Sequence, residues 1–426
     1  MPKTENTAAN THYPALNEAF QFLIACCQAE PDFDEIGLQM RNEKVKIKNG
    51  EEIVSLAARH GILPLVYKTL KTLHSSLLTP RALVSTVGRT PHSSLEQLLN
   101  ELKANYQSIA RRNMLMSAEL LRIMKLLQEN GIETLAFKGP ALAQTAYGDI
   151  TLRQYGDLDI LVHRKDFRRI ADRMMDKGYE PHFPIETFTG EKVLFEMNND
   201  CPFYDRNRGL AVELHWDFFR KLALPTEKFF PWKDQTTVYI NQHPVQTLSP
   251  ESHLLYLALH GSKHIYERLI WIVDIDRFVR AYPDLDWPHM LEMAKNMGAE
   301  KMLLFSLALS RTYFHTPVPD FLIKETDPEN FTALISFVND EFNRENPTPE
   351  DSLTKLRKII ALRDTLYYKV LTVVEFVFRP GINERRMVIL SDRWFWLYWL
   401  LRPLGMGYRF IFCRLLKLCA EPDTSA

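Results

Sequence analysis

The sequence predicts an α+β fold in which a small core of strands and helices lies between two helical segments. Three stretches of its 426 residues differ in apolar pattern. Residues 14–130 and the chain from Ser249 onward place apolar residues at helical spacing, whereas residues 131–248 contain short runs typical of strands. We therefore expect an N-terminal helical segment over 1–130, an α/β core over 131–248 and a C-terminal helical domain over 249–426.

The N-terminal segment contains two long amphipathic patterns. The first, EEIVSLAARHGILPLVYKTLKTL, covers residues 51–73 and is interrupted at Gly61 and Pro64. The second covers residues 94–130 and is stopped by Gly131. Both patterns predict helices with one buried face.

The central segment is predicted to alternate strands with helices. Its expected strands cover 132–137, 157–162, 192–198, 202–205 and 210–216, followed by a hairpin over 236–248. One helix is expected to begin near Pro140, because proline is tolerated in a first helical turn. Another is expected over 164–178, ending at Gly178. Beyond Ser249 we expect helices with loops near 282–287, 316–320 and 345–350.

Composition bounds the class of protein. The formal net charge is −1, so the chain has no global basic field for nucleic acid. The five cysteines, Cys26, Cys27, Cys201, Cys413 and Cys419, lack C-x-x-C spacing. We therefore expect reduced thiols in a cytoplasmic protein, with neither a disulfide framework nor a zinc site.

The sequence shows no segment expected to cross a membrane. Its first 20 residues lack an apolar signal core, and no run reaches 18 consecutive apolar residues. The nearest candidate is residues 394–418, which Arg402, Pro403 and two glycines interrupt. Its aromatic and basic residues are compatible with contact to a membrane surface. The alternative that we favour is a pair of C-terminal helices packed on the protein's own core.

Two aspartates open an otherwise apolar run, LRQYGDLDILV, over residues 152–162. In a strand, Asp157 and Asp159 point to one face and the apolar residues between and after them to the other. Two like charges beside a core are unfavourable unless a positive group lies between them. A divalent cation is one such group, and solvated charges at a strand end are the alternative.

A third acid is supplied by LAVELHWDFF, where Glu213 shares one strand face with His215 and Asp217. In a two-metal displacement, a third carboxylate commonly helps to hold an ion and activates the attacking hydroxyl. Glu213 suits that role, although an exposed face of an antiparallel strand has the same pattern. We expect His215 to be a structural or supporting group.

Lys138 and Gly139 mark a strand-to-helix turn upstream of the acids. A glycine there lets the backbone approach a ligand, and the following helix offers N–H groups and a positive dipole end to phosphate. Carboxylates on a neighbouring strand can hold Mg²⁺ or Mn²⁺ that bridges to the same phosphates. Together these features predict a nucleoside-triphosphate site with a divalent metal.

The segments FKGPALAQTAYGDITLRQYGDLDILV, VELHWDFF and LLYLALHGSKHIYERLIWIVDIDRFV occur in an order that resembles a nucleotidyltransferase family of uncharacterised bacterial proteins. That family belongs to the DNA polymerase β-like superfamily. The resemblance covers roughly residues 50–405 and implies a mixed-sheet nucleotidyltransferase core. It implies that Gly139 is the phosphate-loop glycine and that Asp157, Asp159 and Glu213 are the metal ligands and catalytic acids. The superfamily usually has Gly-Ser or Gly-Gly where this chain has Gly139-Pro140. Proline contributes no N–H, so the charge of Lys138 is the expected compensation.

The chain is also similar to the toxin nucleotidyltransferases of abortive-infection systems. That resemblance implies nucleotide-binding roles for Lys263 and Asp274, which otherwise read as a helix-end cation and as a capping or ion-paired residue. Arg153 matches the family pattern and either touches phosphate or neutralises the carboxylates. His260 and His264 are expected to form hydrogen bonds beside the cleft, because the sequence shows no third metal ligand with them.

The sequence therefore predicts an enzyme that transfers a nucleoside monophosphate from an NTP to an acceptor and releases pyrophosphate. The near-neutral charge favours a small molecule or a protein as acceptor over nucleic acid. The departure at Lys138-Gly139-Pro140 motivates an alternative, a catalytically silent protein that binds nucleotide or acts as an accessory factor.

Overall fold

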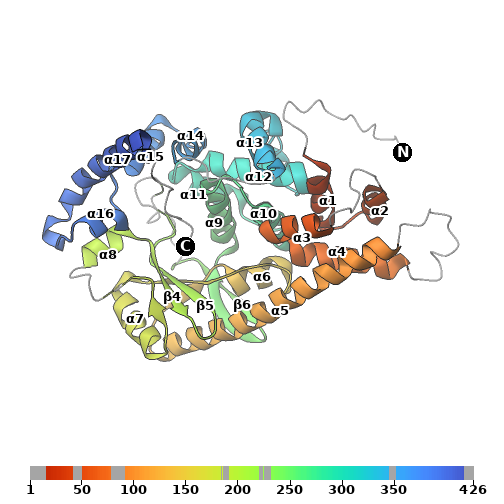
Figure 1. The fold of residues 1–426 in the computed structure, drawn as a ribbon, viewed down its shortest axis with the longest axis horizontal. Helices are drawn as coiled ribbons and strands as arrows, with labels where there is room; N and C mark the ends of the chain where they lie inside the picture. The colour runs from red at the N-terminus through yellow and green to blue at the C-terminus, as the bar shows by residue number, and fades with distance from the viewer. Residues whose placement is uncertain are drawn as a thin grey trace.

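The computed structural model describes residues 16–41, 50–77, 92–183, 185, 191–219, 224, 232–344 and 352–416. Within these residues it is a mixed α/β structure (Figure 1). The helices at the two ends of the chain lie above one side of a central sheet, and a long helix runs along the opposite side. The predicted α+β class is confirmed.

The central sheet is mixed, as the resemblance implied. Its five strands are β1 (Thr134–Ala136), β2 (Leu158–Val162), β3 (Glu180–Pro181), β4 (Asp200–Asp205) and β5 (Leu210–His215). They lie in the order β1-β2-β5-β4-β3, and only the β2–β5 pair is parallel. In that pair Asp159 lies directly beside Glu213. The topology thus brings two acids that are 54 positions apart in the sequence onto neighbouring strands.

A separate hairpin follows the sheet, as predicted. It consists of β6 (Gln235–Ile240) and β7 (His243–Leu248). Asn241 and Gln242 join them, both with positive φ, which is the backbone of a tight hairpin turn. The hairpin packs on β1 and on the helix that follows β1, so it buttresses the edge of the sheet next to the acids.

The N-terminal helices include the break predicted at Gly61. They are α1 (Glu18–Cys26), α2 (Phe33–Arg41), α3 (Gly50–Arg59), α4 (Leu63–Leu77) and α5 (His92–Glu129). Gly61 has a φ of +73°, a conformation that favours glycine, and it turns α3 into α4. Pro64 lies in the first turn of α4, where proline is tolerated.

The 38-residue helix α5 lies along the sheet (Figure 1). Asn113, at its middle, donates hydrogen bonds from its side chain to the carbonyls of Ile150 and Arg153. Arg112 donates to the carbonyl of Gly156. These bonds fix the loop that leads into the Asp157–Asp159 segment.

Three helices lie within the central segment: α6 (Gly139–Tyr147), α7 (Phe167–Asp176) and α8 (Glu191–Met197). Helix α8 corrects the prediction of a strand over 192–198. The buried residues Val193, Leu194 and Met197 fit a helical face as well as an apolar strand. Asp392, distant in the sequence, accepts hydrogen bonds from the N–H groups of Lys192 and Val193 and so caps the helix.

The C-terminal helices are α9 (Pro250–Lys263), α10 (Leu269–Ala281), α11 (Trp287–Asn296), α12 (Glu300–Phe314), α13 (Thr332–Asn343), α14 (Ser352–Ala361), α15 (Leu366–Phe378), α16 (Ile382–Met387) and α17 (Trp396–Leu416). The predicted loops near 282–287 and 316–320 are confirmed, and the one near 345–350 lies outside the described residues. A single helix with Pro403 inside it replaces the helix pair expected over 394–418. Among the described residues, no helix combines the length and apolar character that spanning a membrane requires.

Two apolar clusters hold these elements together. One joins α1 and α4 to the C-terminal helices α9, α10 and α12, so residues from both ends of the chain share one core. The other joins the sheet to α5, α7, α8 and the beginning of α17. The domain boundaries at 130 and 248 stay predictions. Asp157 and Asp159 lie where the sheet meets the C-terminal helices α9 and α10.

Candidate active site

Asp159 lies at the centre of the candidate site. It is 2% exposed within β2, whose five residues are all buried. Asp157 comes one residue before the strand and is partly exposed. Glu213 lies beside Asp159 in β5 and is also partly exposed. The structure thus brings the three predicted acids together on, or directly before, the neighbouring inner strands β2 and β5.

Lys138 supplies a positive charge to this cluster. Its Nζ atom lies 2.9 Å from Oδ1 of Asp159, and only 18% of its side chain is exposed. Burial alone lowers the pKa of Lys138, but Asp159, Tyr256 and Asp157 together outweigh burial and raise the pKa well above its usual value. The ammonium group is therefore a fixed cation at the edge of the acidic cluster.

His215 connects two of the acids. Its Nε2 atom lies 3.2 Å from Oδ1 of Asp159 and 3.2 Å from Oε2 of Glu213. Burial alone lowers the pKa of His215, but the hydrogen bonds to Asp159 and Glu213 raise it to about 10. This contact agrees with the supporting role predicted for His215.

The pKa values of the two aspartates are shifted in opposite directions. The charge of Asp159, with burial, raises the pKa of Asp157 to about 6. Burial alone raises the pKa of Asp159, but Lys138 and His215 hold it well below its usual value. Both carboxylates are therefore largely ionised at neutral pH, and the positive charges of Lys138 and His215 offset part of their mutual repulsion.

Gly139 occupies the turn between β1 and α6. Its φ is +51°, and a Cβ atom at this position would lie 3.2 Å from the backbone carbonyl oxygen of Asp157. The conformation and the close approach both favour glycine. Pro140 brings no N–H, and the N–H of Ala141 bonds to the carbonyl of Lys138. The Gly139 N–H is thus the candidate donor in the first turn of α6, and its contact with a ligand stays a prediction.

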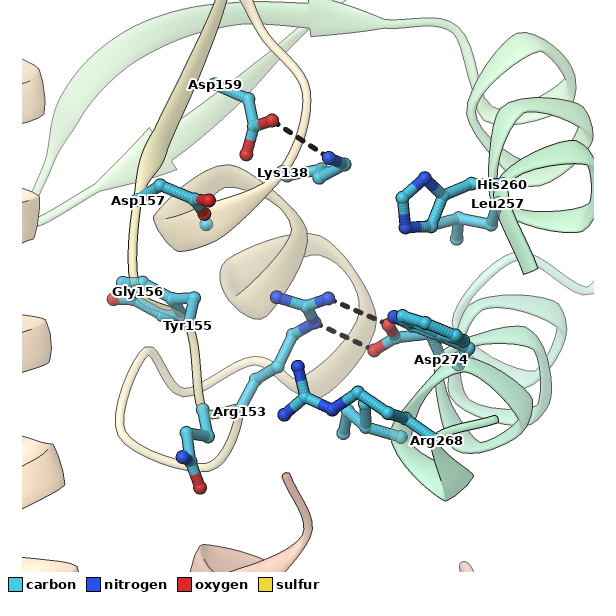
Figure 2. A pocket seen from close by; sticks show the side chains of 14 residues that line it. Lys138, Arg153, Tyr155, Gly156, Asp157, Asp159, Leu257, His260, Arg268 and Asp274 are labelled. Carbon is cyan, nitrogen blue, oxygen red and sulfur yellow. Dashed lines mark hydrogen bonds and ion pairs between the residues drawn. The ribbon is translucent and has the colours of Figure 1, made fainter. Parts of the chain in front are cut away.

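A cavity of about 300 Å³ opens beside these residues (Figure 2). Lys138, Gly139, Asp157 and Asp159 line one side of it, and residues of α9 and α10 line the other. Asp274 faces the cavity from α10 and accepts two hydrogen bonds from Arg153, at 2.8 and 2.9 Å. The Tyr147 hydroxyl donates a third at 2.6 Å.

The Arg153–Asp274 pair clarifies two predicted roles. Both side chains line the cavity, but each is almost fully buried and bonded to the other. Burial alone lowers the pKa of Arg153, and the charge of Asp274 raises it. The ion-paired alternative for Asp274 is therefore what the structure shows. The pair forms part of the cavity wall, and contact of either residue with nucleotide stays a prediction.

Comparison with known families settles the affiliation of the chain. The model of a family described as uncharacterised nucleotidyltransferase matches residues 48–315, more than half of the sequence. The chain belongs to this nucleotidyltransferase family. The family match spans every acid of the site and the helices α9 and α10 that face them.

Other comparisons add little. No curated protein matches the chain. A crystal structure of an antigenic nucleotidyltransferase-like protein from Paracoccidioides brasiliensis is 18% identical, with 47% of this chain and 96% of that chain covered. Its TM-score is 0.30, and a likeness this low carries no argument about fold or function. Bacterial origin and similarity to abortive-infection enzymes stay predictions.

The donor set of this nucleotidyltransferase fits a divalent cation. One ligand atom from each of Asp159, Glu213 and His215 lies within 4.8 Å of the others. Ligands of one ion, each roughly 2.0–2.6 Å from it, lie within about 5 Å of one another. Among the described residues, Oδ2 of Asp159 is buried without a hydrogen-bond partner, which is unfavourable for a carboxylate without a cation. Carboxylate oxygens suit Mg²⁺ and Mn²⁺. The raised pKa of His215 keeps its imidazole protonated at neutral pH, so His215 becomes a ligand only on losing that proton.

The sequence analysis missed Arg268, which faces the cavity beside Arg153 (Figure 2). Its Nε atom donates to the carbonyl of Arg59, and a Cβ atom on Gly61 would lie 2.8 Å from its Nη2. The turn between α3 and α4 therefore holds this guanidinium in place. Burial, together with the charge of Arg153, lowers the pKa of Arg268. Because Arg268 is ordered by a segment some 200 positions away, no local pattern indicated its role.

Helices α9 and α10 add aromatic groups to the wall. His260 and Trp271 line the cavity, and their rings meet edge to face at 5.4 Å. Burial, with the nearby charge of Lys138, lowers the pKa of His260 well below its usual value, so it is a neutral ring. Lys263 is exposed at the end of α9 and does not line the cavity, which agrees with the alternative of a helix-end cation. Its contact with nucleotide stays a prediction. His264 packs against His260 and Trp271.

Proposed function

We propose that this member of the family transfers a nucleoside monophosphate from an NTP to an acceptor hydroxyl. The observation that carries the proposal is Asp159, which is buried with one oxygen lacking a hydrogen-bond partner and lies beside Asp157 and Glu213 at the wall of the cavity. In a structural protein such a carboxylate cluster is unfavourable. In a nucleotidyltransferase it is the expected place for metal and triphosphate.

In this proposal, Asp157, Asp159 and Glu213 hold Mg²⁺ or Mn²⁺. When bound, the metal neutralises charge on the triphosphate and on the attacking and leaving oxygens. The raised pKa of Asp157 and the unpartnered oxygen of Asp159 both support this assignment. The metal, the NTP and the acceptor are elements of the proposal that rest on the chemistry of the donor set.

The cationic side chains would bind the phosphates. The Gly139 N–H and the N-terminus of α6 point a positive dipole at the cavity. Arg268 adds a guanidinium on the opposite wall, where bidentate contact with phosphate oxygens is favourable. His260 and Trp271 offer ring faces and edges to a base. Lys138 would balance the charge of Asp159.

The chemical step follows from the positions of the acids. The acceptor oxygen attacks the α-phosphorus, the bond to the bridging oxygen breaks, and pyrophosphate leaves with the electron pair. Glu213 lies beside Asp159 but does not line the cavity that holds Asp157 and Asp159, and 28% of its side chain is exposed. We assign it to the acceptor side, where it accepts the hydroxyl proton. A small molecule or a protein is the favoured acceptor, since the net charge of −1 offers little attraction to nucleic acid.

One observation favours a second candidate, a nucleotide-binding protein without catalysis. Lys138 already satisfies one oxygen of Asp159 at 2.9 Å, where a metal would compete with it. Pro140 also removes a donor that the superfamily usually has. In this case NTP would bind at the same cavity, and no pyrophosphate would form.

The decisive experiment traces label from α-labelled NTPs in a cell extract. Wild-type protein with Mg²⁺ or Mn²⁺ should label one acceptor, and Asp157→Asn should reduce transfer by about a hundredfold or more. Asp176→Asn is the matched control, because Asp176 is an exposed aspartate on α7. Full turnover by Asp157→Asn contradicts the metal assignment. Tight NTP binding in calorimetry without pyrophosphate release, across a broad set of acceptors, favours the silent binder.

A further inference from the structure

An exposed apolar surface covers the C-terminal helices, far along the chain from the acids. Of the 20 large apolar side chains that are exposed within the described residues, 12 lie between Leu366 and Leu404. This stretch forms α15, α16 and the described part of α17, at one end of the molecule (Figure 1). Single exposed apolar residues are ordinary, but a concentration of this kind marks an interaction surface.

Six of these residues define what we term the C-terminal patch. They are Met387, Val388, Ile389, Trp396, Leu400 and Leu404, with exposed fractions between 43% and 72%. The last three recur every four residues and so share one face of α17.

Contacts between α17 and the segment after α16 make the patch continuous. The Tyr398 hydroxyl donates to the carbonyl of Val388 and accepts the N–H of Leu390, both at 2.8 Å. A Cβ atom on Gly405 would lie 3.8 Å from the sulfur of Met387. The exposed run 387–389 is therefore fixed against the helix that carries Trp396, Leu400 and Leu404.

The acids of this region are all engaged within the protein. Asp364 accepts N–H bonds from the first turn of α12, and Asp392 caps α8. Glu375 pairs with Arg379 at 2.6 Å, and Glu384 pairs with Arg402 at 3.1 Å. Both glutamates are buried. Between residues 362 and 407, two of the four carboxylates are thus neutralised by buried ion pairs, and the other two face helix N-termini.

Exposed cations flank the patch instead. Arg386 precedes the run 387–389 and is exposed. Arg393 is exposed as well and lies over the ring of Trp394, 5.4 Å from its centre. Exposed apolar side chains, interfacial tryptophans and peripheral arginines are the combination that binds the surface of an anionic bilayer. A second copy docked through the same surface would add two more arginines to the interface.

We propose that the C-terminal patch docks the protein onto the surface of an anionic lipid membrane. The apolar residues would enter the interfacial layer, and Arg386 and Arg393 would contact lipid phosphates. No described helix is suited to span the bilayer, so the association is peripheral and reversible. The proposal is independent of the nucleotidyltransferase chemistry.

Co-sedimentation of the full chain with vesicles tests the proposal. Vesicles of phosphatidylcholine alone are compared with vesicles of equal parts phosphatidylcholine and phosphatidylglycerol. Wild-type protein should bind the anionic vesicles, and Leu400→Ser with Leu404→Ser should weaken binding on the order of a hundredfold. Arg386→Glu with Arg393→Glu should weaken binding to anionic vesicles by about fivefold or more per residue.

The matched control is Phe321→Ser with Ile323→Ser, two residues that are 54% and 46% exposed elsewhere on the surface. This control should bind as wild type, and thermal melts of all variants confirm folding. Wild-type protein that stays in the supernatant with both vesicle types overturns the proposal. Equal binding by the Leu400/Leu404 variant overturns it too. So does a wild-type dimer that those substitutions dissociate while lipid has no effect.

Discussion

Breaking the Arg153–Asp274 ion pair should destabilise the fold far more than an exposed pair would. The two side chains are 8% and 1% exposed and share two hydrogen bonds of 2.8 and 2.9 Å. Replacing Arg153 by methionine leaves Asp274 with the Tyr147 hydroxyl as its donor. Leaving one charge of a buried pair without its partner costs about 3–5 kcal/mol of unfolding free energy.

The double variant separates the ion pair from the space that it fills. Arg153→Met with Asp274→Leu removes both charges, so its unfolding free energy should lie closer to that of wild type than either single variant. The expected coupling energy is about 2–3 kcal/mol. Urea unfolding with matched slopes provides the measurement. Single variants within about 1 kcal/mol of wild type, or strictly additive effects, refute the reasoning.

Three further perturbations test other parts of the structure. His253 is 1% exposed, and burial lowers its pKa to about 3 against a smaller opposing effect of the Phe137 backbone. The unfolded state therefore takes up a proton below about pH 6.5, and His253→Leu should remove about 1.4 kcal/mol of destabilisation at pH 5.5 in urea titrations. Gly139→Ala should lower the unfolding free energy by about 1–3 kcal/mol and disturb Asp157. Gly148→Ala should lower it by less, because Gly148 has a similar φ but a Cβ atom there would meet nothing within 4 Å. Equal shifts of the melting temperature would contradict the close approach of Gly139 to Asp157. Burial alone raises the pKa of Glu119, but hydrogen bonds from two arginines and a tyrosine outweigh burial and lower the pKa to about 2. The carboxylate of Glu119 therefore stabilises the fold above about pH 4.5, and this stabilisation is lost as the pH falls toward 2. Glu119→Gln should lower the unfolding free energy by about 1–3 kcal/mol at pH 7 and by little near pH 2. Unfolding curves of both proteins at the two pH values provide the measurement.

The acids of the site could be predicted from sequence because their signal is local. An aspartate inside an apolar strand, as at Asp159, has few explanations other than a charged partner. The same reasoning found Glu213, and strand pairing places the two side by side. Gly139 could also be predicted from the sequence, because a strand-to-helix turn favours the backbone conformations that glycine adopts.

Other features depend on contacts that the sequence does not display. Arg268 is positioned by the turn after α3, and α8 is capped by Asp392 from beyond α16. The pairing of Arg153 with Asp274 joins residues 121 positions apart. Each of these depends on a tertiary contact, and local spacing alone does not encode such contacts. For Lys263, the sequence predicted a position at the end of a helix, but it could not show that the residue does not line the cavity.

Binding of Mn²⁺ in the presence of a non-hydrolysable NTP analogue tests the central claim most directly. The electron paramagnetic resonance signal of free Mn²⁺ reports the bound fraction without requiring a known acceptor. We predict saturable binding by the wild type, weakened by about tenfold or more in Asp159→Asn and in Glu213→Gln, and unchanged in Asp176→Asn. Wild-type protein that leaves the free-ion signal unaltered, or Asp159→Asn that binds as tightly as wild type, would contradict the account.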